Sequence, residues 1–238
     1  MTSLSAADAE QLRLAFQRCR DMEGTLNEQL RAYADASRKV FPAYGEAVDR
    51  LVVRLSGNGG GETAPRPGDA MPPFMLPDES GALVALPALL EQGPAAVMFF
   101  RGHWCPYCRL NVRAVVHAQE RIKAIGAQVV AIMPETQEYT RQVKADSGAP
   151  FPILTDLDNG YALSLNLAIW LGTEIQSLLS YQDMAKFHGN DGWMLPIPAV
   201  FVVGRDGLVK ARFVDPDFRK RMEIDDLIEA LESASEGN

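Results

Sequence analysis

Two cysteines three positions apart, Cys105 and Cys108, stand where a short apolar run gives way to a helical pattern. The run from Ala95 to Phe100 has the length and the apolar character of a buried β-strand, and apolar residues at helical spacing follow Cys108. Pro106 suits the first turn of a helix, because the N–H group that it lacks would have no partner there. A strand followed by Cys-x-x-Cys and a helix strongly indicates thiol redox chemistry in an α/β protein.

The expected place of Cys105, at the N-terminus of that helix, favours its thiolate form. Unpaired N–H groups and the helix dipole stabilise an anion there. A free thiol has a pKa of about 8.5, so a lowered pKa raises the amount of nucleophilic thiolate at neutral pH. Cys108 lies on the same face of the first turn, where its sulfur can reach that of Cys105. The sequence predicts an accessible dithiol in which Cys105 reacts and Cys108 resolves the product as a disulfide.

Three side chains next to the pair are further candidates for the site. Arg101 would either stabilise the thiolate or pair with an acid elsewhere, and the sequence leaves both roles open. His103 would either tune the thiol or lie exposed in the loop. Trp104 is expected to shield the pair by packing against it.

Two other interpretations of the cysteines receive less support. A structural zinc site needs two further ligands, yet the sequence has no second Cys-x-x-Cys, and His117 and His188 stand alone. Two inert buried thiols would make the strand–helix junction a coincidence. We therefore expect no metal and no bound cofactor. The third cysteine, Cys19, lies in a helical apolar stripe and is expected to be a buried structural thiol rather than an intersubunit disulfide.

The charge balance narrows the classes of partner. With 23 Lys and Arg against 31 Asp and Glu, the net charge is −8, whereas nucleic-acid binding relies on clustered basic residues. No apolar run reaches the roughly 18 residues of a membrane span, and residues 1–10 do not resemble a secretory signal. We expect no nucleic-acid partner, no membrane association and, from the low cysteine content, a cytoplasmic location.

Composition divides the chain into three parts. Residues 1–56 carry apolar residues at helical spacing and predict an N-terminal helical extension. Two pairs with the spacing of capping boxes begin its helices: Ser5 with Asp8, and Thr25 with Glu28. Residues 57–67 are rich in Gly and Pro and predict a flexible linker, since the Lys-Ser/Thr of a phosphate-binding loop is missing. Residues 68–238 form the main domain.

The main domain alternates strand and helix patterns. The expected strands are 95–100, 128–133, 151–154, 199–203 and 208–214, with a hairpin across 74–86. One helix is expected directly after Cys108, and three further helices are expected at 136–144, 161–167 and 224–231. These elements predict an α/β fold with a central mixed sheet flanked by helices. The pattern of 168–195 is mixed and predicts no element.

From Arg66 to Leu231 the sequence resembles the thioredoxin-fold superfamily. It is more closely similar to the peroxiredoxin-like branch of the alkyl hydroperoxide reductase and thiol-specific antioxidant family. The resemblance rests on Phe100-Arg101-Gly102 leading into Trp104-Cys105-Pro106-Tyr107-Cys108, on Pro72-Pro73-Phe74 with Leu76-Pro77-Asp78, on Pro196-Ile197-Pro198-Ala199, and on Asp215-Pro216-Asp217-Phe218. Cys-Pro-Tyr-Cys is also the active-site tetrapeptide of glutaredoxins. The resemblance implies a thioredoxin-like fold.

The resemblance also implies a proline in a cis peptide opposite the Cys-x-x-Cys, where its backbone would meet a thiol substrate, and Pro198 matches that position. The chain departs from the family elsewhere. Peroxiredoxins carry proline seven residues and threonine or serine three residues before the peroxidatic cysteine, and counted from Cys105 these positions hold Met98 and Gly102. The family's catalytic arginine falls near Pro198 and is absent. The buried aspartate of thioredoxins is replaced by Phe99.

The leading functional hypothesis is a thiol-dependent peroxidase. Cys105 would attack hydrogen peroxide or an organic hydroperoxide, become a sulfenic acid and condense with Cys108. Arg101 is the best available cation, and Trp104, His103 and Pro198 are the candidates for substrate contacts. A thioredoxin or glutathione system would reduce the disulfide.

Two other functions stay open. One is a thiol–disulfide oxidoreductase like thioredoxin or glutaredoxin, which Cys-x-x-Cys with Pro198 favours. The other is a non-catalytic redox-responsive interaction module, which the long helical extension favours. The helices of residues 1–56 would either form a homodimer or pack back on their own domain.

Overall fold

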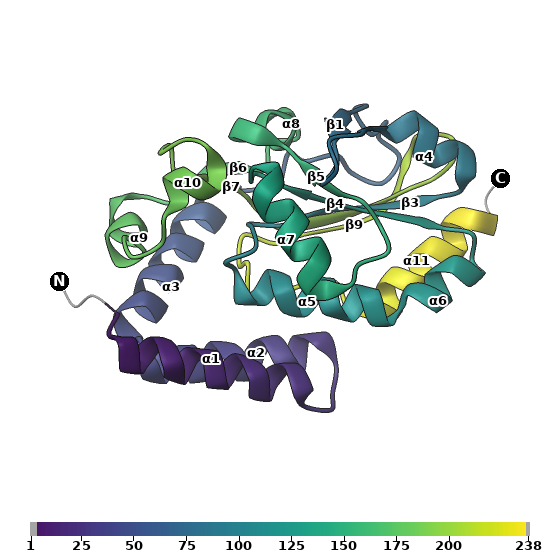
Figure 1. Ribbon diagram of the computed structural model, residues 1–238. Coiled ribbons are helices and arrows are strands. Elements are labelled where there is room, and N and C mark those ends of the chain that lie inside the picture. Colours follow the sequence, from purple (N-terminus) through teal and green to yellow (C-terminus); the bar gives the residue numbers. More distant parts are fainter. Residues whose placement is uncertain (1–3, 237–238) are drawn as a thin grey trace.

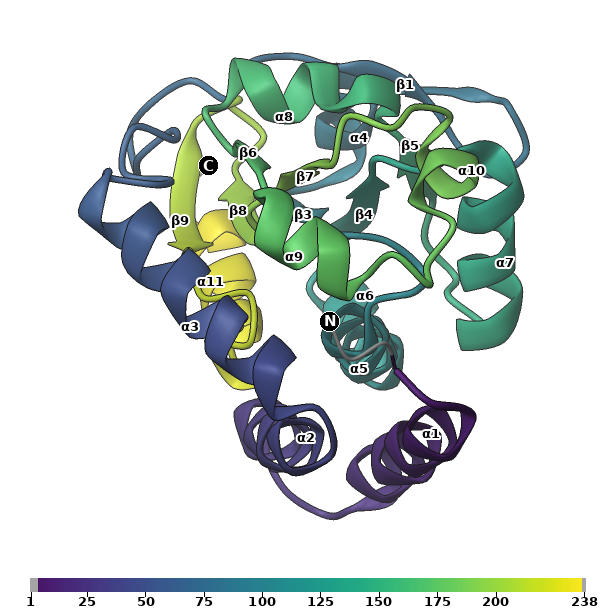
Figure 2. The same cartoon turned by 90° about the vertical axis from the view of Figure 1, so that its left-hand side faces the viewer.

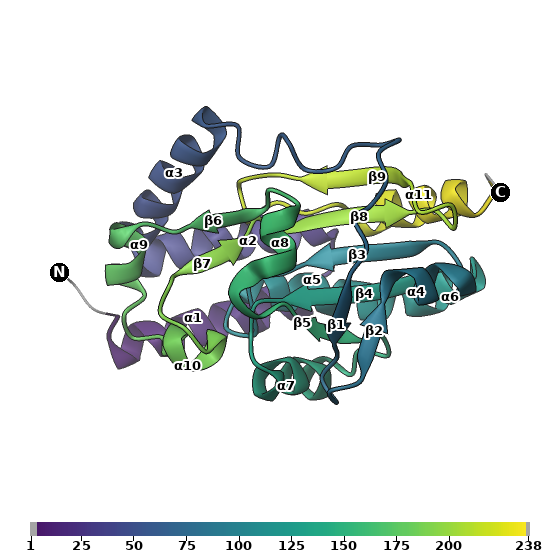
Figure 3. The ribbon, with the colours of Figure 1, turned by 90° about the horizontal axis from the view of Figure 1, so that it is seen from above.

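Residues 4–236 are described by a computed structural model, at whose centre lies a five-stranded mixed sheet in the order β5-β4-β3-β8-β9 (Figure 3). Its strands are β3 (Ala95–Phe99), β4 (Gln128–Met133), β5 (Ile153–Thr155), β8 (Ala199–Val203) and β9 (Val209–Val214). β3, β4 and β5 run parallel, whereas β8 is antiparallel to both β3 and β9. The predicted α/β class with a mixed sheet is confirmed.

The central strands are continuous apolar runs because both faces of the sheet are covered. Every residue of β3 and of β8 is buried, as expected for strands with helices on either side. In Figure 1, one face carries α4 and α8, and the other carries α5, α6 and α11. These helices are α4 (Leu86–Gln92), α5 (Pro106–His117), α6 (Gln119–Ala124), α8 (Gly160–Ser164) and α11 (Ile224–Glu236). A further helix, α7 (Gln137–Ser147), packs against β5 and α5.

Two small antiparallel pairs flank the central sheet. β1 (Met75–Pro77) and β2 (Leu83–Ala85) form the predicted hairpin. β6 (Ala168–Trp170) pairs with β7 (Met194–Pro196), and the chain between them forms α9 (Thr173–Leu178) and α10 (Met184–His188). A short 3-10 helix, η1 (Leu157–Asn159), precedes α8. Residues 168–195, for which the sequence predicts no element, therefore contain two paired strands with two short helices between them.

The N-terminal extension forms three helices, α1 (Ala6–Asp21), α2 (Leu26–Val40) and α3 (Pro42–Gly57). Both predicted capping boxes are present, at Ser5 and at Thr25. Figures 1 and 2 show α1 and α2 as a further layer beyond α5, with α3 rising beside them. α2 packs on α5 and α3 packs on α9, so the apolar stripes are buried within their own chain. A homodimer through these helices stays a prediction.

Residues 57–67 contain a succession of turns after α3, in which Gly61 and Ala64 are buried and Glu62 and Thr63 are exposed. The predicted linker stays a prediction. Ala64 is buried in the core, and its carbonyl accepts a hydrogen bond from the Arg212 guanidinium. Gly61 has a φ of +79°, and a Cβ there would stand 2.6 Å from Cγ1 of Val214. Glycine is therefore needed for close packing, a role that composition does not separate from flexibility. The division of the chain into three domains at these boundaries stays a prediction.

None of the helices within residues 4–236 is long and apolar enough to cross a membrane.

Candidate redox site

The cysteine pair lies at the start of α5, as predicted. Cys105 is the N-cap residue, with an extended backbone, and Pro106 occupies the first helical position. The carbonyl of Cys105 accepts the first helical hydrogen bond from the N–H of Arg109, at 3.1 Å. Both cysteines are free thiols in this structure. The structure thus agrees with the helix-terminal placement of Cys105 and with Cys108 on the same first turn.

The predicted accessibility of the pair is wrong for the conformation described. Cys105 is 0% exposed and Cys108 is 1% exposed. The ring of Tyr107 lies edge-on to Tyr33 of α2, with centroids 5.3 Å apart, and to Phe218, at 5.5 Å. The N-terminal helices and the segment before α11 therefore close over the start of α5. The sequence cannot show which surface its apolar helices will cover.

The two sulfurs have different electrostatic surroundings. Burial raises the pKa of the Cys105 thiol well above its usual value, and its hydrogen bond to Cys108 raises it further. Burial opposes ionisation of Cys108 as well, but the hydrogen bond with Cys105, the charge of Arg221 and the backbone N–H of Arg101 together lower its pKa to about 6. The closed site therefore favours the thiolate on Cys108, and the expectation from the helix dipole alone, which favours Cys105, is not met here.

Arg101 is a buried cation beside the pair. Its guanidinium lies over the rings of Phe218, at 3.8 Å, and Trp104, at 4.9 Å, and its Nη2 has no hydrogen-bond partner. Burial disfavours its charge, but Tyr44 and the two thiols hold its pKa above the usual value. Of the two roles left open by the sequence, the geometry favours a charge facing the sulfurs over a pair with an acid.

A cavity of about 490 Å³ opens between the N-terminal helices and the start of α5. Arg101, Trp104, Pro106 and Tyr107 line its inner end. Nε1 of Trp104 is buried and, like Nη2 of Arg101, has no partner. Two unpaired donors therefore belong to side chains that line the cavity nearest the cysteines, where burying them without a partner is costly. Trp104 both packs, as expected, and carries a free donor.

His103 does not belong to the lining of this cavity and instead binds Glu135, a residue that sequence reasoning missed. Its Nδ1 lies 2.6 Å from Oε1 of Glu135, and its backbone N–H donates to Oε2 at 2.7 Å. Its ring also stacks on Tyr139, with centroids 4.5 Å apart. Glu135 is fully buried, and burial raises its pKa. Parallel strands β3 and β4 end at the same edge, so an acid just after β4 could have been predicted near the cysteines.

Pro198 is buried immediately before β8, whose Ala199 pairs with Phe99 at the end of β3. This register sets Pro198 beside the chain that leads to the cysteines, in agreement with its predicted position. The predicted cis peptide is wrong, because the Ile197–Pro198 bond is trans. The N–H of Ile197 donates to the carbonyl of Leu167 at 2.8 Å, which keeps the chain extended from β7 into β8.

Cys19 and His188 lie in other parts of the fold than the Cys105–Cys108 pair. Cys19 is buried on α1, as expected of a structural thiol. His188, at the end of α10, is 2% exposed, and its Nε2 has no partner. Within residues 4–236 no cluster of three or more His, Cys, Asp and Glu side chains suits a metal ion.

His188 is expected to make folding stability depend on pH. Burial, aided by the charges of His103 and Arg101, lowers its pKa from 6.5 to about 4. The unfolded chain binds this proton below pH 6.5 and the folded chain does not, so stability falls as the pH falls through that window. Between pH 8 and pH 5 the protein should lose about 2 kcal/mol more unfolding free energy than the non-titrating variant His188→Gln. Urea unfolding at each pH measures this difference, and parallel pH profiles would contradict it.

The central mixed sheet, the flanking helices and the Cys-x-x-Cys at a helix N-terminus define a protein with a thioredoxin-like fold and two thiols at the start of α5. The sequence profile of the AhpC/TSA family matches residues 67–212, more than half of the chain. The chain belongs to the AhpC/TSA family. The chloroplastic peroxiredoxin Q of Sedum lineare is 30% identical over 92 residues, which are 39% of this chain and 49% of that relative. The chain therefore matches about half the length of this curated relative.

Solved structures show the same fold. The peroxidoxin BcpB of Mycobacterium tuberculosis is 18% identical, with a TM-score of 0.56 over 71% of this chain and 97% of that chain. A mutant of peroxiredoxin 6 of Arenicola marina is also 18% identical, with a TM-score of 0.55 over 70% of this chain and 72% of that chain. The expected resemblance to the peroxiredoxin-like branch is confirmed. The family match leaves out α1–α3 and everything beyond residue 212.

Proposed function

We propose that this protein is a thiol peroxidase that reduces hydrogen peroxide or an organic hydroperoxide and oxidises Cys105 and Cys108 to a disulfide. One observation carries the proposal: a dithiol at a helix N-terminus lies beside a cavity whose lining side chains hold two unpaired donors, Nη2 of Arg101 and Nε1 of Trp104. Membership of the AhpC/TSA family supports it.

The first step forms a sulfenic acid. The sulfur of Cys105 attacks one peroxide oxygen, the O–O bond breaks, and the departing alkoxide or hydroxide takes the proton that Cys105 gives up. Negative charge grows on the departing oxygen, so the donors of Arg101 and Trp104 are suited to stabilise it. In this mechanism Arg101 polarises the peroxide, and Trp104 and Pro198 bound the space beside the sulfur. His103 acts more remotely, by holding Glu135.

The second step forms the disulfide. Cys108 attacks the sulfenic sulfur of Cys105, the S–O bond breaks, and the oxygen leaves as water or hydroxide. The pair lies within one helical turn, so this step needs no distant part of the chain. A thioredoxin or glutathione system returns two electrons and restores both thiols. Because the sulfurs are buried, peroxide and reductant both require the cover of N-terminal helices to open.

Intact mass after one equivalent of peroxide tests this proposal. The reduced protein is expected to lose two hydrogens, because the product is an intramolecular disulfide. Cys108→Ser is expected to gain one oxygen on Cys105 instead, since no resolving sulfur remains. Digestion and mapping of the oxidised residue complete the measurement. An unchanged mass, or an added oxygen in the unsubstituted protein, would refute the disulfide mechanism.

A further inference from the structure

Arg221 brings a positive charge to the cysteine pair from outside the segment that matches the family. It lies between β9 and α11, beyond residue 212, and is 3% exposed. Its Nη2 lies 3.7 Å from Sγ of Cys108, within hydrogen-bond distance for sulfur. The backbone N–H of Arg101 donates to the same sulfur at 3.4 Å. Two N–H donors therefore meet at Cys108, one of them charged.

The Arg221 guanidinium is held by backbone carbonyls of its own segment. Its Nη1 donates to the carbonyls of Phe218 and Lys220. Its Nε has no partner, although the atom is buried. These contacts leave Nη2 for the sulfur, and a buried guanidinium without an acid needs a counter-charge nearby. In the described contacts of Arg221, the Cys108 sulfur is the group able to supply that charge.

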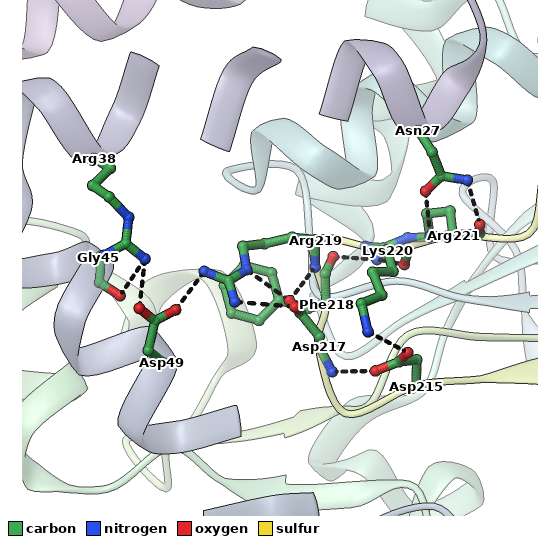
Figure 4. A network of polar contacts seen from close by, with 10 residues as sticks. All are labelled: Asn27, Arg38, Gly45, Asp49, Asp215, Asp217, Phe218, Arg219, Lys220 and Arg221. Atoms are coloured by element: carbon green, nitrogen blue, oxygen red, sulfur yellow. Dashed lines mark hydrogen bonds and ion pairs between the residues drawn. The ribbon is translucent and has the colours of Figure 1, made fainter. Parts of the chain in front are cut away.

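Helix α2 of the N-terminal extension holds this segment in place (Figure 4). Nδ2 of Asn27 donates to the carbonyl of Arg221 at 2.8 Å, and Oδ1 of Asn27 accepts the N–H of Arg221 at 3.1 Å. The carboxylate of Glu223 accepts the N–H groups of Leu26 and Asn27, at 3.1 and 2.9 Å, and so caps the start of α2. The backbone on both sides of the guanidinium is thus tied to α2.

A second clamp joins the same segment to α3. Arg219 donates to Asp49 at 2.8 Å and to Asp217 at 2.7 Å, and Arg38 donates to the other oxygen of Asp49 at 2.6 Å (Figure 4). These groups are partly exposed, and no hydrogen bond connects Arg219 to either cysteine among the described contacts. Arg219 is therefore a neighbouring arginine of the same segment that is paired with carboxylates and has no described contact with the cysteine sulfurs.

We propose that Arg221 is the cation that stabilises the Cys108 sulfur as a thiolate, and that the N-terminal extension positions it through Asn27. Asn27 acts through Arg221 and is a positioning residue. Arg221 lies beyond residue 212, so this charge reaches the pair from outside the segment that matches the family. This assignment gives the extension a role within the site in addition to covering it.

The Cys108 thiolate would also act as a base in the peroxidase reaction, a role that rests on the proposed function. Cys105 and Cys108 lie in the first turn of α5, and their interaction raises the pKa of Cys105 and lowers that of Cys108. When Cys105 attacks the peroxide, Cys108 takes its proton and passes it to the departing oxygen. Cys108 is then a thiolate again, attacks the sulfenic sulfur and displaces hydroxide. The reaction stays balanced without another acid or base.

Several charged or titratable groups face the pair and set the background for a pH measurement. The cations are Arg101 and Arg221, which favour the thiolates. The Glu135 carboxyl, which is held by His103, opposes them when it is ionised. Burial raises the pKa of Tyr33, Tyr44 and Tyr107, so these side chains stay neutral. Among residues 4–236, Arg221 is the one buried cation whose side chain donates to the Cys108 sulfur.

Thiolate absorbance near 240 nm, followed against pH, tests the proposal without using peroxide. The reference is the double variant Cys105→Ser/Cys108→Ser, which removes the signal of both sulfurs. The unsubstituted protein should ionise with a midpoint below the ordinary thiol pKa of about 8.5. Arg221→Met should raise the midpoint by about 1–3 pH units, because an opposite charge close to the sulfur is lost. Arg221→Lys should restore most of the shift, and Asn27→Ala should raise the midpoint in the same direction as Arg221→Met.

The matched control is Arg219→Met, which removes a neighbouring arginine of the same segment and should leave the midpoint unchanged. The single cysteine variants show which of the two sulfurs ionises at low pH, even if Arg221→Met does not fold. Cys105→Ser should keep a thiolate with a low midpoint, and Cys108→Ser should lose it. The proposal is overturned if Cys108→Ser keeps the low midpoint, or if Arg221→Met titrates like the unsubstituted protein. It is also overturned if Arg219→Met shifts the midpoint as much as Arg221→Met. A normal titration together with absent peroxide turnover would refute the proposed function and leave this inference standing.

Discussion

Cys105→Ser is expected to lower the rate of peroxide consumption at least about a thousandfold, the scale on which removal of an enzyme nucleophile acts. The serine hydroxyl does not ionise near neutral pH and cannot form a sulfenic acid, so the first step has no acceptor for the peroxide oxygen. The remaining Cys108 is the third residue of α5 and the resolving thiol of the proposed mechanism, so it does not replace Cys105 as the nucleophile. Peroxide loss with a dithiol reductant in excess measures the effect.

Cys19→Ala is the matched control for this experiment. Cys19 is the third cysteine of the chain, is buried on α1 and forms no part of the pair. Its removal should leave the rate unchanged. Equal rates for Cys105→Ser and the unsubstituted protein would refute a peroxidase that depends on Cys105. A much faster reaction of the unsubstituted protein with a small disulfide than with peroxide would instead favour a thiol–disulfide oxidoreductase.

Leu30→Ala is expected to lower the free energy of unfolding of the whole protein by about 2–5 kcal/mol. Leu30 is a residue of α2 and is 0% exposed. It belongs to the same hydrophobic core as Cys105 and as Leu110 of α5, which are part of the main domain. Truncation removes buried apolar surface and leaves a cavity that its neighbours only partly fill. Because the core is shared, urea should unfold the extension and the main domain in one transition.

The exposed residue Leu14 on α1 provides the comparison. Leu14→Ala loses little burial and should change the stability by less than about 0.5 kcal/mol. Fluorescence and far-UV circular dichroism should report the same midpoint for each variant. An early transition that removes only helical signal from Leu30→Ala would show that the N-terminal helices unfold independently. That outcome would support the predicted division into separate parts.

Much of the fold could be predicted because its elements carry local patterns. The strands 95–100, 128–133 and 199–203 are continuous apolar runs, and in the structure the corresponding strands are buried on both faces. The capping boxes at Ser5 and Thr25 depend on residues three apart, so they too are visible in sequence. Short elements are predicted less well: the expected helix 161–167 is α8 at Gly160–Ser164, and the expected strand 151–154 is β5 at Ile153–Thr155.

The candidate site could be predicted only in part. Cys105, Cys108, Arg101 and Trp104 lie within eight positions, so one strand–helix junction brings them together. Glu135 follows a neighbouring parallel strand and was within reach of the same reasoning. Arg221 and Asn27 are 194 residues apart and follow no local pattern, and they meet only because α2 packs against α5.

The sequence by itself determined the dithiol, the helix that begins at it and the alternation of elements that yields a mixed sheet, because each depends on residues close together in the chain. The tertiary structure decided that this dithiol is covered and that a remote arginine reaches its second sulfur. It also decided which of the two thiols is favoured as the thiolate. That choice depends on burial and on charges from separate segments, which a one-dimensional pattern does not contain.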